Sequence, residues 1–415
     1  MDSIVRDMNL WENGERKISW AWEHMPILQK ISEEFSQSQC LKGERIVVSI
    51  HLEAKTANLA KVLAAGGADV YVTGSNPLST QDDVSAALAK TGIKVFAWRN
   101  ATEAEYVEHL NRALDCKPTI VIDDGGDLVH LLHSTRKEMA SDVIGGSEET
   151  TTGVLRLRAR ARDKELSFPM IAVNDAYCKH LFDNRYGTGQ SVWTAIMQTT
   201  NMVMSGKNVV VAGYGWCGKG VAMRAKGLGA HVIITEIDPV KAIEAVMDGF
   251  KVMTMDEAAP LGDVFVTVTG CSDVIRKSHF ASMPNGAIMC NAGHFDVEIN
   301  IPELETAAEN KFLARNNIMS YKMSDKRTIN LLAEGRLVNL AAGDGHPIEI
   351  MDMSFALQAL AAKYVAENMR GVEAQVYEIP SILDQKVAEY KLAAWGIQID
   401  KLTDAQTDYL GSCGV

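Results

Sequence analysis

The stretch VVVAGYGWCGKG, residues 209–220, passes from a run of branched apolar residues into a glycine-rich turn. Gly213, Gly215 and Gly218 form the pattern G-x-G-x-x-G, directly after the expected strand and before the helix-like sequence GVAMRAKGLGA. Glycines at these places permit a tight turn and a close approach of the backbone to a pyrophosphate, and the helix N-terminus presents free N–H groups to it. The stretch therefore predicts a strand, a turn and a helix that bind a dinucleotide.

The acid expected of such a site is Glu236, which ends the next strand-like run, HVIITE. A carboxylate here hydrogen-bonds the adenosine ribose diol and repels a 2′-phosphate, so NAD is favoured over NADP. Lys241 follows in the same segment, and a cation near that ribose would soften the discrimination. Three glycines alone can also form a turn that binds nothing, but here the strand, the helix and the acid are in register.

Strand-like and helix-like segments alternate in two regions of the chain. The first contains the runs RIVVSI at 45–50, DVYVTG at 69–74 and TIVIDDGG at 119–126, and the second contains NVVVAG at 208–213, VFVTVTG at 264–270 and AIMCNAG at 287–293. This alternation is typical of βαβ units, and 415 residues exceed the roughly 250–300 that one core supports. The sequence predicts an α/β fold with two doubly wound parallel sheets and polar clusters at their carboxyl ends.

The composition excludes several classes of partner. Fifty-three acidic residues against 41 basic ones give a net charge of −12, which disfavours nucleic acid, because its binding depends on phosphate neutralisation. No apolar run is long enough for a membrane span, and the first residues contain no secretory h-region, so a cytoplasmic protein is expected. The seven cysteines are scattered and lack a C-x-x-C pair, so neither a structural zinc site nor a disulfide framework is suggested, and no metal is expected.

Several long and unusual segments lie along the chain: NPLSTQDD, IDDGGDL, SEETTTGV, VND, KHLFDN, AGYGWCGKG, IITEIDP, NAGHFDVEI, LLAEGRLVNL and GHP. Through them the chain resembles the S-adenosylhomocysteine hydrolases over nearly its whole length. The resemblance implies a reversible hydrolysis in which tightly held NAD oxidises the ribose 3′-hydroxyl, homocysteine leaves C5′, water adds, and the stored hydride returns. A bound NAD would then cause no net redox change.

The resemblance also implies a division of the chain. Residues 1–185 and 346–383 would form a substrate-binding domain, residues 186–345 an inserted Rossmann NAD-binding domain, and residues 384–415 a C-terminal oligomerisation segment. The small-molecule substrate would be a nucleoside thioether, and a homotetramer is expected.

Six residues match the family's catalytic positions. Lys179 and Asp183 match the groups at the ribose 3′-oxygen, and one helical turn would place them on one face, where desolvation could lower the pKa of the lysine. Asp124 and His51 match the acid and base groups for the C4′ and C5′ protons. Glu149 matches a ribose-binding acid, and His294 a residue near the substrate. Taken alone, Lys179 and Asp183 would more simply be a surface ion pair, His51 a structural histidine and Asp124 a turn residue.

Further positions match substrate or cofactor contacts. Substrate contacts are implied for Lys55, Thr56, Asp124, Glu149, Lys179, Asp183 and His346, and ribose contacts also for Asn174. Cofactor contacts are implied for Thr150, Thr151, Thr152, Asn184, Gly213, Gly215, Gly218, Glu236, Thr269, Ala292 and Asn339.

At two positions near the expected nucleobase, this chain has a charged residue where familiar members of the family have another type. Lys55 stands where an acidic or amide side chain receives the adenine 6-amino group, and lysine only donates hydrogen bonds. It suits a 6-oxo group as in hypoxanthine, so an S-inosylhomocysteine hydrolase is one of two alternatives. Asp344 replaces an apolar residue nearby. Alternatively Lys55 turns away or pairs with Glu53, and backbone groups recognise adenine.

Two other functions remain open at this point. An ordinary NAD-dependent dehydrogenase would explain the glycine loop but not the DDGGD, SEETTTG and KHLFDN clusters. A non-catalytic regulator that binds NAD would be expected to have lost part of the catalytic set, which here is complete.

Overall fold

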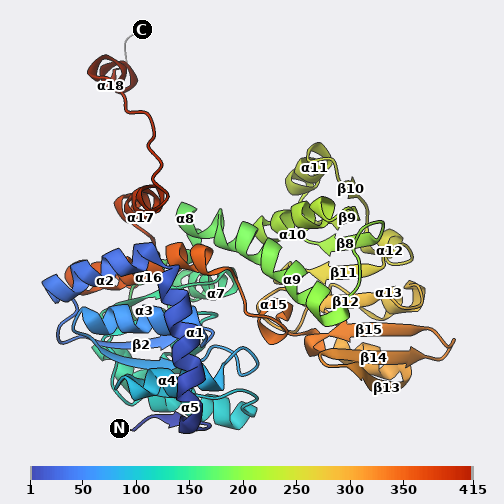
Figure 1. The fold of residues 1–415 in the computed structure, drawn as a ribbon, viewed down its shortest axis with the longest axis horizontal. Coiled ribbons are helices and arrows are strands. Elements are labelled where there is room, and N and C mark those ends of the chain that lie inside the picture. Colours follow the sequence, from blue (N-terminus) through green and yellow to red (C-terminus); the bar gives the residue numbers. More distant parts are fainter. Residues whose placement is uncertain (1, 413–415) are drawn as a thin grey trace.

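The computed structural model describes residues 2–412, which form two lobes, each built around an eight-stranded sheet (Figure 1). The first lobe comprises residues 2–180 and 348–394, and the second comprises residues 188–341. The two-sheet α/β architecture predicted from the sequence is confirmed.

The sheet of the first lobe is parallel throughout. Its strands, in spatial order, are β1 (Ile4–Val5), β4 (Lys94–Ala97), β3 (Asp69–Thr73), β2 (Arg45–Ser49), β5 (Ile120–Asp123), β6 (Gly145–Glu148), β7 (Met170–Ala172) and β16 (Val376–Glu378). The helices of this lobe are α1 (Trp11–Glu23), α2 (Pro26–Ser38), α3 (Ala54–Ala65), α4 (Asp82–Lys90), α5 (Glu103–Leu114), α6 (Asp127–Leu132), α7 (Thr151–Arg162), α8 (Tyr177–His180), α16 (Ile348–Asn368) and α17 (Ser381–Ala394).

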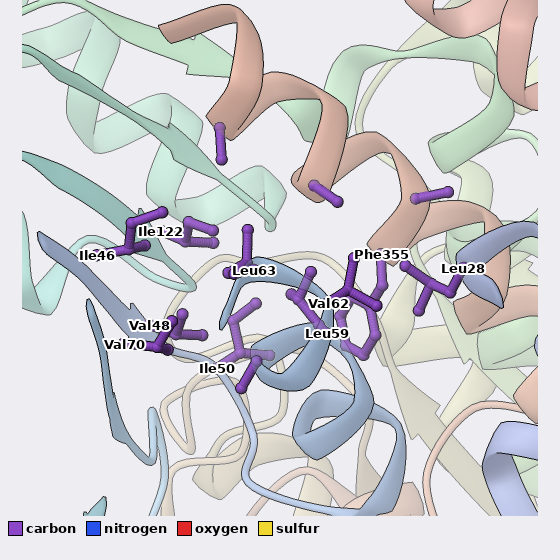
Figure 2. Close-up of a cluster of buried hydrophobic side chains, with 14 of the residues drawn as sticks. Leu28, Ile46, Val48, Ile50, Leu59, Val62, Leu63, Val70, Ile122 and Phe355 are labelled. Atoms are coloured by element: carbon purple, nitrogen blue, oxygen red, sulfur yellow. The ribbon is translucent and has the colours of Figure 1, made fainter. Parts of the chain in front are cut away.

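Alternate residues of the strands bury against helices on the two faces of this sheet. Ile46 and Val48 of β2 point into a core that includes α2, α3 and α16, where Phe355 packs among leucines (Figure 2). Val47, between them, joins a second core with α5 and α6. This arrangement explains why the strands are near-continuous apolar runs. Helix α16 is buried over most of its length because it lies inside the lobe.

The sheet of the second lobe has the order of a dinucleotide-binding fold, followed by a hairpin. Its strands are β10 (Lys251–Val252), β9 (His231–Thr235), β8 (Asn208–Ala212), β11 (Val264–Thr267), β12 (Ile288–Asn291), β15 (Thr328–Leu332), β14 (Ile318–Met323) and β13 (Ala308–Arg315). The first six strands are parallel. Strand β14 runs antiparallel to both neighbours, an addition that the sequence analysis did not include. Asn317, with φ at 61°, turns the chain between β13 and β14.

The second lobe carries the helices α9 (Thr188–Thr200), α10 (Trp216–Gly227), α11 (Pro239–Met247), α12 (Met255–Ala258), α13 (Lys277–Ser282), α14 (Ile301–Ala307) and α15 (Val338–Ala341). The chain crosses between the lobes through the turn Asp183–Gly187 before α9, and returns between α15 and α16. At the first crossing a Cβ on Gly220 of α10 would overlap the carbonyl of Arg185, so glycine permits this close approach.

Helix α18 (Asp404–Gly411) stands away from both lobes (Figure 1). Its side chains are exposed, Tyr409 and Leu410 among them. Residues 413–415 of the predicted C-terminal segment, and Met1 of the predicted substrate domain, lie outside the described residues. Within residues 2–412 no helix combines the length and apolar character needed to cross a membrane.

Candidate active site

A cavity of about 1190 Å³ is lined by residues of both lobes. It brings together almost every residue that the sequence singled out: His51, Lys55, Thr56, Asp124, Glu149, Thr150, Thr151, Thr152, Lys179, Asp183, Asn184, Gly213, Gly215, Glu236, Thr269, Ala292, His294, Asn339 and His346. Gly218 is buried behind the cavity wall, where a Cβ would overlap the carbonyl of Gly213, so it packs helix α10 against the glycine turn.

The glycine turn has the geometry that a dinucleotide requires. Gly213 has φ at 103°, which favours glycine, and a Cβ on Gly215 would meet no atom within 4 Å, so the backbone there is open to a ligand. Helix α10 begins at Trp216 beside the cavity and directs its first N–H groups there. These features fit a bound pyrophosphate.

Glu236 is held rigidly at the end of β9. Its Oε2 accepts a hydrogen bond from the Tyr214 N–H at 2.7 Å, and its Oε1 accepts one from the Ile237 N–H at 2.7 Å. Lys241, the cation that raised the question of NADP, lies 3.6 Å from a carboxylate oxygen of Asp238. Glu236 therefore places a carboxylate at this end of the cavity, as an NAD site requires, and Lys241 lines the same end.

Other predicted cofactor positions are held in a similar way. Thr269 donates from its backbone and its hydroxyl to Glu298, a buried acid that the sequence analysis missed. Asn339 donates to Ser191 at 3.0 Å, while its buried Oδ1 has no hydrogen-bond partner among the described residues and is available to a ligand. Thr151 and Thr152 begin helix α7, and Thr150 precedes it.

Lys179 lies at the centre of a buried polar cluster. Its Nζ is 2.7 Å from Asn184 Oδ1, 3.4 Å from Asn174 Oδ1, 3.5 Å from Asp183 Oδ1 and 3.6 Å from Glu149 Oε1. Lys179 and Asp183 therefore meet as expected, although α8 ends before Asp183. Burial lowers the pKa of Lys179, but the charges of Asp183 and Glu149 outweigh it and raise the pKa to about 12. The lowered pKa expected from desolvation is thus wrong.

The pKa values of the two carboxyl groups beside Lys179 shift in opposite directions. Burial raises the pKa of Glu149 to about 8 even though Lys179 opposes the shift. The pKa of Asp183 falls well below its usual range despite burial, because Lys179 and His346 lie beside it. His346 Nδ1 is 2.8 Å from Asp183 Oδ1. Asp183 is therefore charged at neutral pH, whereas Glu149 can gain or lose a proton near neutral pH.

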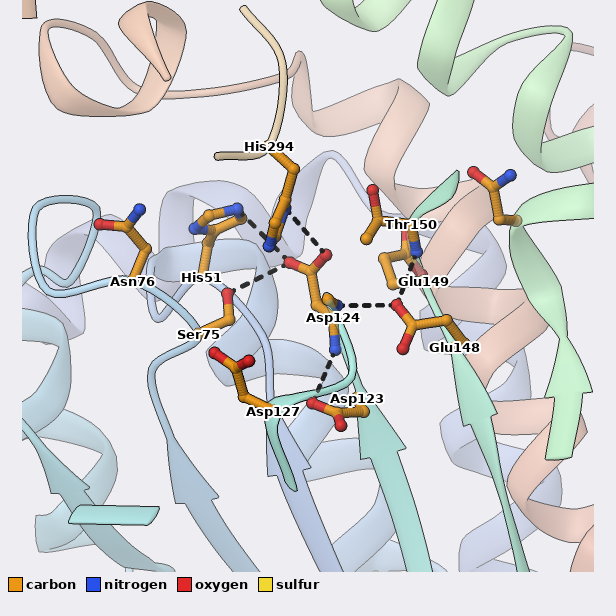
Figure 3. A network of polar contacts seen from close by, with 12 residues as sticks. His51, Ser75, Asn76, Asp123, Asp124, Asp127, Glu148, Glu149, Thr150 and His294 are labelled. Carbon is orange, nitrogen blue, oxygen red and sulfur yellow. Dashed lines mark hydrogen bonds and ion pairs between the residues drawn. The ribbon is translucent and has the colours of Figure 1, made fainter. Parts of the chain in front are cut away.

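A second cluster surrounds Asp124 at the end of β5 (Figure 3). His51 Nε2 is 3.4 Å from Asp124 Oδ2, and His294 Nδ1, from the second lobe, is 3.7 Å from Asp124 Oδ1. Burial lowers the pKa of His51 to about 4, so this imidazole is neutral at neutral pH. Ser79 contacts His51 Nδ1 at 2.6 Å and thereby fixes its ring.

These three side chains place one ligand atom each within 4.8 Å of one another, a spacing that can hold a metal ion. The sequence predicts no metal site, and this stays a prediction, because the spacing alone also fits a proton-transfer cluster.

Two further acids support the Asp124 loop from beneath, and the sequence analysis missed them. Glu148 Oε1 accepts hydrogen bonds from the Gly125 N–H at 2.8 Å and the Thr150 N–H at 3.0 Å, and it joins two functional loops (Figure 3). Burial raises the pKa of Glu148 well above its ordinary value and that of Asp123 to about 8. Asp123 and Glu148 lie inside the motifs IDDGGDL and SEETTTGV, whose sequence does not separate supporting acids from the neighbouring functional ones.

Lys55 is buried in the cavity wall and does not point to solvent. Its Nζ donates to the carbonyls of Asp344 and His346, each at 2.8 Å, and lies 3.2 Å from Glu53 Oε2. The pairing with Glu53 that the sequence left open is therefore present, whereas Asp344 is exposed. Thr56 donates to the carbonyl of His51 at 2.6 Å and connects this region to the Asp124 cluster.

Comparison with known proteins agrees with this site. The family model "S-adenosyl-L-homocysteine hydrolase, NAD binding domain" matches residues 184–345, and "S-adenosyl-L-homocysteine hydrolase" matches residues 2–143. An S-inosyl-L-homocysteine hydrolase of Methanocaldococcus jannaschii is 58% identical over 98% of this chain and 98% of its own. An adenosylhomocysteinase of Pyrococcus abyssi is 58% identical over 99% of this chain and 97% of its own. The chain, with its NAD-binding lobe, therefore belongs to the S-adenosyl-L-homocysteine hydrolase family.

Proposed function

We propose that this protein reversibly hydrolyses the thioether of S-adenosylhomocysteine or S-inosylhomocysteine to homocysteine and the nucleoside. The observation that supports this most strongly is that the glycine turn, the Lys179 cluster and the Asp124 cluster line one cavity. Bound NAD supplies reversible oxidation of the ribose 3′-carbon, which acidifies the C4′ hydrogen. A simple dehydrogenase would not need the second cluster.

At the ribose 3′-oxygen, the proton passes to the pair formed by Lys179 and Glu149. The pKa of about 12 keeps Lys179 protonated, so it acts as a base only after it has given up a proton. Glu149, whose pKa is about 8 and whose Oε1 is 3.6 Å away, can receive that proton. Asp183, Asn174 and Asn184 orient the ammonium and the ribose hydroxyls.

At C4′ and C5′, the proton transfers belong to the second cluster. Asp124 removes the C4′ proton, and neutral His51, whose Nε2 is 3.4 Å from Asp124 Oδ2, accepts that proton and passes it to the leaving sulfur. In the second half His51 accepts a proton from the attacking water, and Asp124 returns a proton to C4′. His294 closes the site from the second lobe and shields it from solvent. Thr56, Lys55 and His346 hold the nucleoside base and ribose.

We further propose that residues 1–185 and 346–383, extended to Ala394 so that helix α17 stays whole, form the substrate-binding domain, residues 186–345 the NAD-binding domain and the segment after Ala394 the oligomerisation segment of a homotetramer. The exposed apolar side chains of α18 support an assembly role for that segment.

The test uses purified protein and both thioethers. Released nucleotide is identified after denaturation, free homocysteine is measured with a thiol reagent, and the absorbance of reduced nicotinamide is followed during turnover. We expect NAD with little NADP, and thiol release without net reduction. Reduced nicotinamide that accumulates in proportion to product would contradict the proposal and indicate a dehydrogenase.

A further inference from the structure

Helix α16 touches both carboxylates that flank Lys179. Ser354 and Gln358, one turn apart on this helix, are fully buried. The Ser354 hydroxyl donates to Asp183 Oδ2 at 2.6 Å, and the Gln358 amide donates to Glu149 Oε2 at 2.5 Å.

In each carboxylate the helix binds one oxygen and Lys179 faces the other. Ser354 binds Asp183 Oδ2 while Lys179 lies 3.5 Å from Oδ1, and Gln358 binds Glu149 Oε2 while Lys179 lies 3.6 Å from Oε1. A carboxylate fixed at one oxygen cannot rotate its other oxygen away from the ammonium without losing a buried hydrogen bond.

We propose that Ser354 and Gln358 are positioning residues, which hold the two carboxylates in the orientation that lets Lys179 exchange a proton with Glu149. This rests on the function proposed above and adds a residue pair that acts through Asp183 and Glu149 without touching the reacting atoms.

The orientation of the Gln358 amide is itself fixed. Its Oε1 accepts a hydrogen bond from the Ser147 hydroxyl at 2.6 Å, so the NH₂ group is directed at Glu149. Ser147 lies in strand β6, directly before Glu148. Strand β6 therefore fixes the orientation of the Gln358 amide, and the amide in turn fixes the orientation of the Glu149 carboxylate that faces Lys179.

The hydrogen bond from Gln358 also affects titration, because it lowers the pKa of Glu149 against the raising effect of burial. The charged groups that face Glu149 are Lys179, Asp183 and Asp124, and the first of these lowers its pKa while the other two raise it. Loss of the amide donor therefore moves the pKa of Glu149 upward.

The experiment compares Gln358→Met, which keeps the volume but removes the donor, with Leu357→Met, a volume-conserving change in the buried neighbour that faces the core. Ser354→Ala and Ser354→Thr form a second pair, in which threonine retains the hydroxyl. The holoenzyme is mixed with nucleoside, and the single-turnover rate of nicotinamide reduction is measured across pH. We expect Gln358→Met to lower this rate by about tenfold to a hundredfold and to move its pH midpoint upward, with a smaller change in KM. Ser354→Ala should lose rate, and Ser354→Thr should recover it.

A second readout does not depend on turnover. Calorimetric binding of a 3′-deoxynucleoside, which cannot be oxidised, in two buffers of different ionisation enthalpy gives the protons taken up or released on binding. Gln358→Met should change that number near neutral pH and Leu357→Met should not. Gln358→Glu donates only when protonated, so its deficit should be smaller at acid pH than at alkaline pH.

A pH midpoint and proton count unchanged in Gln358→Met, or an equal loss in Leu357→Met, would overturn the positioning role. If the wild-type enzyme instead accumulates reduced nicotinamide, the proposed hydrolysis fails, while the calorimetric result still decides the role of Gln358.

Discussion

Lys179→Ala and Asp124→Asn should separate the oxidation step from the elimination step. Lys179 Nζ lies within 3.6 Å of oxygens from Asn184, Asp183 and Glu149, so its truncation leaves two buried carboxylates facing each other without a cation. Loss of a positioned acid–base group costs about 10²- to 10⁴-fold in rate, or roughly 3–5 kcal/mol of barrier. Reduction of bound nicotinamide by nucleoside should therefore nearly stop.

Asp124→Asn should give the opposite pattern. Asparagine keeps the size and the contact that Ser75 makes at 3.2 Å, but it cannot take the C4′ proton. The charge of Asp124 contributes to the raised pKa of Lys179, so its removal eases deprotonation of the lysine and should not slow oxidation. Bound nicotinamide should become reduced at a near-normal rate, whereas exchange of the C4′ hydrogen and thiol release fall by about 10²- to 10⁴-fold.

Stopped-flow absorbance measures the first step, and deuterium incorporation at C4′ measures the second. Both variants should first be shown to bind 3′-deoxynucleoside and to retain NAD. Equal rates of nicotinamide reduction in the two variants and wild type would refute the division of roles between the clusters.

Three other predictions can be tested on the same protein. Glu236→Ala should weaken NAD binding by about tenfold to a hundredfold and reduce the preference for NAD over NADP, as measured by titration of the apo form with each nucleotide. An unchanged preference would show that another group excludes the 2′-phosphate. Lys55 Nζ contacts three acceptors in the cavity wall, the carbonyls of Asp344 and His346 and Glu53 Oε2, so it serves a 6-oxo base only by exchanging one of them for the base. With that exchange, S-inosylhomocysteine should be hydrolysed at least as well as S-adenosylhomocysteine by kcat/KM, and Lys55→Glu should shift the ratio about tenfold to a hundredfold toward adenine. A strong adenosine preference that the change leaves intact would show that the three contacts keep Lys55 away from the base. Burial raises the pKa of Asp123 to about 8, so the folded protein holds an extra proton between about pH 4 and 8 and loses stability as pH rises through that window. Asp123→Asn should flatten the dependence of the unfolding free energy on pH by up to about 1.4 kcal/mol per pH unit, as measured by urea unfolding at several pH values. The same pH dependence in the variant and wild type would count against a protonated Asp123.

Local patterns predicted the parts of the site that one segment builds alone. The turn at Gly213 and the helix after it are determined by a few adjacent residues, and Lys179 and Asp183 meet because they are four positions apart. The cluster of Asp124 with His51 could be expected because parallel strands end at one edge of a sheet.

The parts that depend on distant segments were not predictable in this way. Ser354 and Gln358 lie in a helix whose sequence is that of an ordinary buried helix, and their partners are more than 170 residues away. The direction of the pKa shift of Lys179 was misjudged because Glu149 and Asp124, which come from distant segments, add to the charge of the nearby Asp183. The antiparallel hairpin depends on a single Asn317 turn between otherwise unremarkable strands.

The late position of α16 in the chain also constrains how the protein is made. Strands β1 to β7 leave the ribosome before the whole second lobe, whereas the helix that fills their core and binds Asp183 and Glu149 follows it. Until α16 arrives, the nascent first lobe has an open apolar face and two carboxylates without these partners, while the second lobe, continuous in sequence, can already fold. Completion of the catalytic lysine site is thus among the last events of synthesis, so a chain truncated before α16 can form a nucleotide-binding lobe but not this site.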